Sequence, residues 1–164
     1  MEINRPRYGV EIITTGFHVK GLVEPVGPWL EFMNNRERHT LTVLNANASP
    51  LGGKNSHLPE HPQVYLSRHD VCAVILSDPA ARAAMTILKH AEPAIAHVGP
   101  LICRCEFHMG AESHLNTFFD DLAGDFFVAT HVELYVSATP SNPLPHRAEM
   151  MLINRRQVRL FYSA

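Results

Sequence analysis

The middle of the sequence reads Val64-Tyr-Leu-Ser-Arg-His-Asp-Val-Cys-Ala-Val-Ile-Leu76, and a second version of this stretch, Met151-Leu-Ile-Asn-Arg-Arg-Gln-Val-Arg-Leu-Phe-Tyr-Ser163, closes it. In each version an apolar strand runs into a short polar corner that contains arginine, and a valine then starts a second apolar strand. Each version is therefore predicted to form a β-hairpin. The chain is predicted to contain two copies of one unit.

The segments that begin each half also recur in the same order. Residues 8–24 are rich in β-branched side chains, which predicts two strands or one bent strand. Residues 94–110 repeat this pattern in the second half. Gly21 indicates a bulge or a close approach of two backbones. A short helical plug is predicted at Trp29–Asn35, and Leu115–Asp121 occupies the same place in the second half.

The segments that lead into the two hairpins correspond as well. A strand predicted over residues 39–46 matches a longer one over residues 125–137. Each is followed by a loop rich in turn-forming residues, at 47–62 and 138–145. Repeated order and spacing of this kind indicate an internal duplication, and chance repetition of generic β patterns is the alternative.

Residues 77–92 are predicted to form the helix that connects the two halves. Ser77 or Asp78 can cap its first turn, Pro79 is tolerated at its first position, and Pro93 ends it. The chain is thereby divided into a first β repeat over residues 8–76, a connecting helix over 77–93, and a second β repeat over 94–164.

The predicted fold is mainly β with a connecting α-helix. A unit of about 70 residues is near the lower limit for burying a core, so two units that share an interface are favoured. We expect a pseudo-two-fold pair of small β-barrel or sandwich units, each with a short helical plug. They form either two barrels side by side or sheets merged into one system, with the helix packed across the junction.

The composition limits the classes of binding partner and the cellular compartment that we expect. The 164 residues include 14 Lys and Arg against 16 Asp and Glu, a formal charge of −2, which offers no general attraction for nucleic acid or an anionic membrane. No apolar run approaches the roughly 18 to 20 residues that span a bilayer. Three cysteines cannot complete a disulfide framework, and the first residues show no secretory pattern, so a reducing, cytoplasmic setting is expected.

Several packing motifs of the first half are similar to a known family. They are Val19-x-Gly21-x-Val23, the plug at Trp29–Asn35, the strand through Leu41–Ala46 and the stretch Val64–Val71. Together they resemble a family of short, uncharacterised bacterial β-rich domains. The second half resembles it more loosely, with Phe107 in place of the glycine and Leu115 at the Trp29 position. The resemblance implies a fold and brings no catalytic residue.

A second resemblance concerns a ligand. The stretch Asn47-Ala-Ser-Pro-Leu-Gly-Gly53 is similar to the Asp/Asn-x-Ser-x-x-Gly loop of PilZ-like cyclic dinucleotide receptors. The resemblance implies that Asn47, Ser49 and a pair of upstream arginines grip the ligand. Arg36 and Arg38 lie too close before the loop to reproduce the paired-arginine spacing of that family, and turn chemistry alone also accounts for such a loop.

The two corners are a further pair of binding candidates. Arg68 and His69 in the first half correspond to Arg155 and Arg156 in the second, and together they could present two cationic tips to an anionic partner. The alternative is that these corners are polar because they face water.

Two groups of residues are candidates for metal binding. Cys103 and Cys105 lie on one face of a predicted strand near His108, and soft ligands of this kind could hold zinc. The same positions form the apolar half of an alternating strand, where cysteine packs as a small hydrophobe. His57 and His61 are four residues apart, but Pro59 prevents the helix that would make this spacing a metal clamp.

No pattern in the chain indicates catalysis. A Gly-x-Ser-x-Gly nucleophile elbow and a glycine-rich phosphate loop are both missing from the sequence. We therefore expect a non-enzymatic binding, scaffold or regulatory module without a cofactor. It would self-associate, or bind a protein partner, through exposed sheet edges or the connecting helix. The alternatives are a PilZ-like cyclic dinucleotide receptor and a metal-dependent enzyme.

Overall fold

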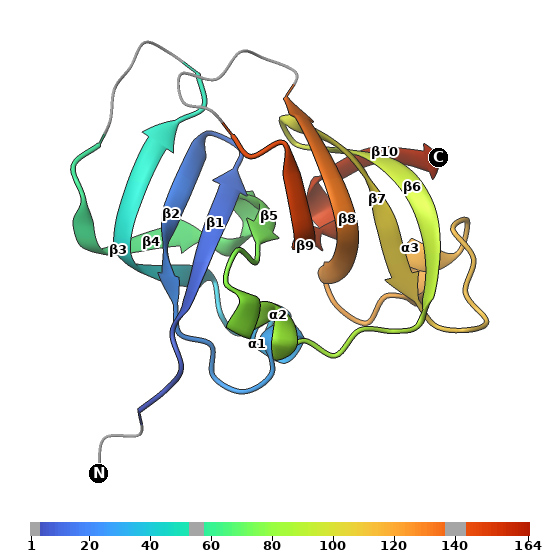
Figure 1. The fold of residues 1–164 in the computed structure, drawn as a ribbon, viewed down its shortest axis with the longest axis horizontal. Helices are drawn as coiled ribbons and strands as arrows, with labels where there is room; N and C mark the ends of the chain where they lie inside the picture. Colours follow the sequence, from blue (N-terminus) through green and yellow to red (C-terminus); the bar gives the residue numbers. More distant parts are fainter. Residues whose placement is uncertain (1–3, 53–57, 137–143) are drawn as a thin grey trace.

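A computed structural model of the chain describes residues 4–52, 58–136 and 144–164. Ten antiparallel strands form one continuous sheet in the order β10-β6-β7-β8-β9-β5-β1-β2-β3-β4 (Figure 1). The strands are β1 (Tyr8–Thr14), β2 (Phe17–Val23), β3 (Thr40–Pro50), β4 (His61–Ser67), β5 (Val71–Ile75), β6 (His90–Val98), β7 (Leu101–Met109), β8 (Phe126–Val136), β9 (Arg147–Asn154) and β10 (Val158–Ser163). The mainly β prediction is confirmed.

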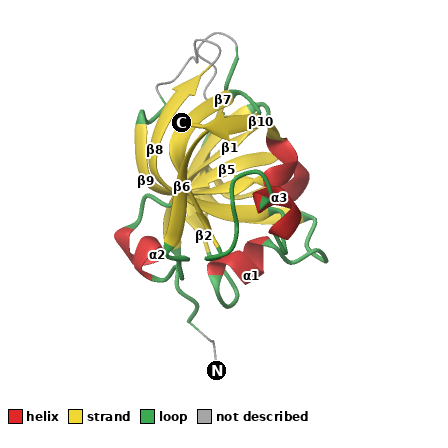
Figure 2. Ribbon diagram, turned by 90° about the vertical axis from the view of Figure 1, so that its right-hand side faces the viewer, coloured by secondary structure: helices red, strands yellow, loops and turns green. Residues whose placement is uncertain are grey.

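The helices are short and lie outside the sheet. They are α1 (Trp29–Met33), α2 (Pro79–Ala83), α3 (Phe118–Asp121) and two single-turn 3-10 segments, η1 (Arg68–Asp70) and η2 (Arg155–Gln157). In Figure 2, α2 and α3 lie on opposite sides of the sheet. The sheet does not close into a barrel, because β10 and β4 remain its two ends. Of the two arrangements expected from the sequence, the sheets of the two halves are merged.

The two halves of the sheet have the same internal order. In the first half, β1 to β5, the spatial order is β5-β1-β2-β3-β4, and in the second half, β6 to β10, it is β10-β6-β7-β8-β9. The strand pairing is interrupted at matching places, between Lys20 and Leu22 and between Arg104 and Glu106. Opposite each interruption lies a residue with a left-handed backbone, Asn45 at φ 47° and His131 at φ 51°.

The hairpin prediction for Val64–Leu76 is wrong. In the described part of the chain β4 pairs with β3 alone, whereas β5 pairs with β1 and β9. The reason is that η1 turns the chain away from β4, so that it continues on the opposite side of the first half. The same holds at the end of the chain, where η2 separates β9 from β10 and β10 pairs with β6.

The central strands are buried on both faces, because the merged sheet covers two separate cores. Val71 and Val74 of β5 point into the core around Trp29, whereas Ala73 and Ile75 point into the core around Phe107. Strands β8 and β9 are shared in the same way. An apolar run without alternation, such as Val71–Leu76, is the pattern that double-sided burial requires.

The connecting helix begins as predicted and ends much earlier. The Asp78 carboxylate accepts a hydrogen bond from the Ala80 amide at 2.9 Å, and Pro79 occupies the first position. The predicted extent to residue 92 is wrong, because β6 starts at His90 and pairs with β7 over its whole length. Nine ladder positions outweigh the helix propensity of an alanine-rich segment, which tertiary context commonly overrides.

Strand β3 also differs from its predicted bounds. It extends to Pro50, whereas the loop is predicted to begin at residue 47, so the prediction ends the strand four residues too early. The indication at Gly21 is confirmed, since a Cβ there would lie 2.5 Å from Val43 Cγ1 and 2.7 Å from the Leu44 carbonyl oxygen. The glycine therefore lets the backbones of β2 and β3 approach closely at the irregularity in their pairing.

Candidate functional site

The corner arginine of the first half is a structural residue. Arg68 is 7% exposed, and its Nη1 donates a hydrogen bond to the backbone carbonyl of Met33 at 2.9 Å. This carbonyl belongs to the last turn of α1, where no amide of the helix can reach it. Arg68 therefore holds the helical plug against the η1 corner, and its neighbour His69 is exposed.

The corner arginine of the second half does the same for α3. Arg155 Nη1 donates to the carbonyl oxygens of Phe119 and Leu122, at 3.0 and 3.4 Å. Its Nη2 also pairs with Asp125 at 3.1 Å. The matched pair Arg68 and Arg155 thus binds the helical plug in each half through hydrogen bonds to backbone carbonyls.

Asp125 completes the second corner by joining both arginines. Its side chain is 8% exposed, and Arg156 Nε approaches its second oxygen at 3.1 Å. Burial raises the pKa of Asp125, but the hydrogen bonds and positive charges of Arg155 and Arg156 outweigh burial and lower the pKa below its ordinary value. Arg156 is 60% exposed in its side chain, so it remains the accessible cation at this corner.

The junction between the halves is an antiparallel pairing of β5 with β9. Its opposed pairs are Ala73 with Ile153, Val74 with Leu152, and Ile75 with Met151, all buried. Because both strands pair outward as well, the junction makes the ten strands one sheet. Apolar side chains of β5 and β9 pack into the two cores, one on each face of the junction.

Side-chain amides add polar contacts at the junction. Asn154 is 1% exposed and donates its Nδ2 to the Val71 carbonyl at 2.9 Å. Asn34, at the end of α1, bonds both backbone groups of Phe126, at 2.7 and 3.1 Å. Side-chain amides that bond backbone groups of another strand in this way favour one register of pairing.

The two ends of the sheet carry exposed apolar side chains. Tyr65 on β4 is 64% exposed, and Leu160 and Tyr162 on β10 are 50% and 49% exposed. In the described part of the chain neither strand has a neighbour on its outer side, so backbone amides and carbonyls there face outward. These two edges are the strongest candidate for an interaction surface.

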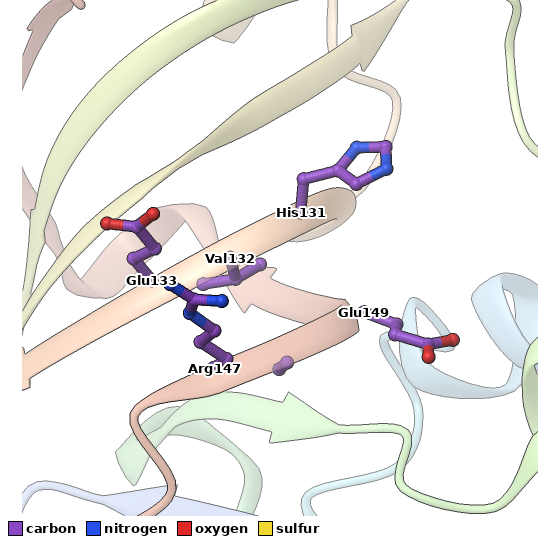
Figure 3. Close-up of a pocket in the computed structure, with 6 residues that line it drawn as sticks. His131, Val132, Glu133, Arg147 and Glu149 are labelled. Atoms are coloured by element: carbon purple, nitrogen blue, oxygen red, sulfur yellow. The ribbon is translucent and has the colours of Figure 1, made fainter.

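A shallow, charged groove runs beside β8 and β9. It encloses a volume of about 550 Å³ and is lined by His131 and Glu133 of β8 and by Arg147 and Glu149 of β9 (Figure 3). His131 Nδ1 lies 2.8 Å from a Glu106 carboxylate oxygen. Glu149 in turn lies 3.1 Å from Arg82 Nε. His131 and Glu149 are thus paired with charged residues outside the groove. The lining includes no serine, cysteine or threonine nucleophile.

The cysteines and His108 do not come together as a metal site. Cys103 and Cys105 share one strand face, as predicted, but that face lies in the core against Phe107. Burial raises the pKa of both thiols, that of Cys105 to about 12. His108 points to the opposite face, where Nε2 lies 2.6 Å from the Thr130 hydroxyl.

The remaining metal and ligand candidates are placed as follows. No group of three or more metal-ligating side chains occurs within the described ranges. His57 lies outside the described residues, and His61 is the first residue of β4. Asn47 and Ser49 lie on β3, paired with Lys20 and His18, rather than in a loop.

Sequence reasoning expected exposed sheet edges but did not identify β4 and β10 as the strands that form them. A signal for β10 was present, because Leu160-Phe-Tyr162 is an apolar run without alternation, which predicts a strand covered on both faces. In the structure this run is covered on one face only, as Phe161 packs against the second core while its neighbours remain exposed. Among the residues that the structure describes, none covers the outer face of β10, although its apolar pattern is typical of a strand covered on both faces.

Comparison with known proteins returns no match: no family model, no curated protein and no solved structure is similar to this chain. No helix in the described ranges is long and apolar enough to cross a membrane. The function is therefore argued from the geometry of the sheet and its edges.

Proposed function

We propose that this protein is a non-enzymatic binding and scaffold module that holds other polypeptides by adding them to the ends of its sheet. The observation that carries the proposal is the exposure of Tyr65, Leu160 and Tyr162 on the two end strands, β4 and β10, each of which is paired on one side only within the described residues. Main-chain hydrogen bonds to an edge strand supply affinity, and alternate side chains supply specificity.

The central segments of the two edge strands lack the features that usually prevent such pairing. Edge strands are commonly protected by charges, prolines or bulges. The segments Val64–Leu66 of β4 and Leu160–Tyr162 of β10 contain neither a charge nor a proline. Pro62 and Arg159 lie beyond these segments, so the apolar length left for an incoming strand is short, which suits reversible binding.

The correspondence between the halves supports the same function. Both halves share one strand order, one position of the left-handed residue and one arginine bond to a helical plug. We infer that they are copies of one unit. In this chain one copy already binds the other through an edge strand, at the β5–β9 junction, so edge pairing is a property of the unit itself.

The experiment is a selection of peptides on the purified full chain. A phage-displayed library of random heptapeptides is panned on the protein and on a variant carrying Tyr65→Lys, Leu160→Lys and Tyr162→Lys. We expect peptides with alternating apolar residues to be enriched on the unchanged protein and to bind the variant at least about tenfold more weakly, since lysine on an edge opposes strand addition.

The matched control carries lysine at exposed apolar positions away from the edges, Leu88 and Tyr135, each 55% exposed. The control variant should retain full peptide binding, and circular dichroism should show the same fold for all three proteins. Peptides that bind the edge variant and the parent equally well would contradict the proposal.

A further inference from the structure

We infer that the partner at these edges is a second copy of this chain, with β4 of one molecule paired to β10 of the next in the register of the internal β5–β9 junction. The inference rests on the proposed function, because it uses the same two edges. It names their occupant and the pairing, residue by residue.

Strand β10 is the counterpart of β5. Each follows a 3-10 corner and pairs with the first strand of its own half. Each pairing also skips one residue at the same place, Cys72 in β5 and Arg159 in β10. The shared irregularity fixes the alignment: Leu160 stands where β5 has Ala73, and Tyr162 where it has Ile75.

Strand β4 is the counterpart of β9 by the same reasoning. Each precedes the corner arginine, Arg68 or Arg155, and pairs with the third strand of its half. Counting back from the arginines aligns Leu66 with Ile153, Tyr65 with Leu152, and Val64 with Met151. The remaining edges of the molecule are therefore the two sides of a junction like the one inside it.

Transferring the internal register gives three specific contacts. The junction opposes Ala73 to Ile153, Val74 to Leu152 and Ile75 to Met151. The corresponding pairs between molecules are Leu160 with Leu66, Phe161 with Tyr65, and Tyr162 with Val64. Every pair joins two apolar or aromatic side chains, and such cross-strand pairs stabilise a sheet.

The same transfer accounts for each exposed residue of the edges. At the junction Leu152 of β9 leaves its own half and enters the core of the first half, beside Val74. By analogy Tyr65 enters the second core of the neighbour, beside Phe161. Leu160 and Tyr162 in turn cover Leu66 and Val64, so the three most exposed apolar groups of the edges become buried together.

The junction has a direction, which limits the assembly. One molecule offers β4 and its neighbour offers β10, so the contact is head-to-tail and leaves a free edge of each kind at the ends. Repetition closes into a ring or continues as a filament. A two-fold dimer would instead pair β4 with β4 or β10 with β10.

The test is disulfide formation between full-length variants under mild oxidation. Val64→Cys in one chain and Tyr162→Cys in another should cross-link when mixed, and neither should cross-link alone. A mixture of Val64→Cys with Leu160→Cys, which is two residues out of register, should give at least about tenfold less product, because a disulfide requires a Cα separation of about 4.4–6.8 Å. The natural cysteines are all buried and provide little background.

A second measurement uses the unmodified chain. Sedimentation velocity over a concentration series should show association, and the Tyr65→Lys variant should sediment as a monomer at the same concentrations. Cross-linking of Val64→Cys with itself, equal yields from the two mixtures, or a monomer at all concentrations would overturn the inference. If peptides still select for the edges in that case, the proposed function stands and only the identity of the partner falls.

Discussion

Replacing Arg68 with methionine tests whether the corner arginine holds the helical plug. Methionine replaces the side chain of Arg68 only as far as about Nε, so the apolar part of the space stays filled, but the guanidinium group and its hydrogen bond to the Met33 carbonyl are lost. Arg68 is 7% exposed and bonds at 2.9 Å within the first core region. The substitution therefore leaves a carbonyl at the end of α1 that water reaches poorly.

The magnitude follows from these contacts. A hydrogen bond from a charged donor contributes about 1.5–3 kcal/mol, and the variant gains back part of this because it no longer buries a guanidinium charge. We expect the free energy of unfolding to fall by about 2 kcal/mol. For a chain of this length the midpoint of thermal unfolding should then fall by about 4–8 °C.

The assay is denaturant unfolding followed by the fluorescence of Trp29, the single tryptophan of the chain, which is 2% exposed and lies in α1 itself. The control is Arg156→Met. Its side chain is 60% exposed, and its partner Asp125 keeps the ion pair with Arg155, so the substitution should cost about 0–1 kcal/mol. An equal, small effect of the two substitutions would refute the reasoning.

Four further outcomes are expected. Gly21→Ala should destabilise the protein by about 1–3 kcal/mol through overpacking against Val43. The control Gly9→Ala, with open space at its Cβ, should change the stability by less than about 1 kcal/mol. Equal midpoints of thermal unfolding for the two variants would contradict the close approach at Gly21. Because the pKa of Asp125 is lowered in the folded state, its contribution to the free energy of unfolding is present above its ordinary pKa of 3.8 and is lost as pH falls through the lowered pKa. The difference in stability between the parent and Asp125→Asn should therefore be full at pH 7 and shrink below about pH 4. A difference that does not change with pH would argue against the ion pairs. The three buried thiols should react with a disulfide reagent only after unfolding, and rapid reaction of the native protein would show that the cores open. Titration calorimetry with a cyclic dinucleotide should give no binding heat, because Asn47 and Ser49 lie along β3 instead of a loop; saturable heat that Asn47→Ala removes would restore the receptor hypothesis.

Several local features of the fold were predictable because their causes lie within a few residues. Asp78 followed by Pro79 specifies a capped first turn, and the cap forms as expected. At position 21 only glycine fits against the Leu44 carbonyl, because it has no Cβ. Alternating and β-branched segments predict strands wherever they occur, and the strands of both halves follow the predicted order.

The errors occur where a distant part of the chain makes the decision. Residues 84–92 have helix-forming composition, but pairing with β7 draws His90 and its neighbours into a strand. Arg68 looks like a solvated corner residue in the sequence, yet its acceptor is Met33, contributed by a helix 35 residues earlier. The hydrogen-bond partner decides the burial of the arginine, and no local pattern names it.

The sequence by itself determined that Val64–Leu76 has two apolar strands around an arginine corner and that a second such stretch ends the chain. Only the tertiary structure decided what those strands pair with. A three-residue 3-10 turn sends β5 to the far side of its half, where it meets β9, so the expected hairpin does not form. The position of the backbone in the fold decides which strands pair. The hydrophobic pattern decides only which face of each strand is buried. For the same reason β4 and β10, the counterparts of β9 and β5, are left as the open ends of the sheet.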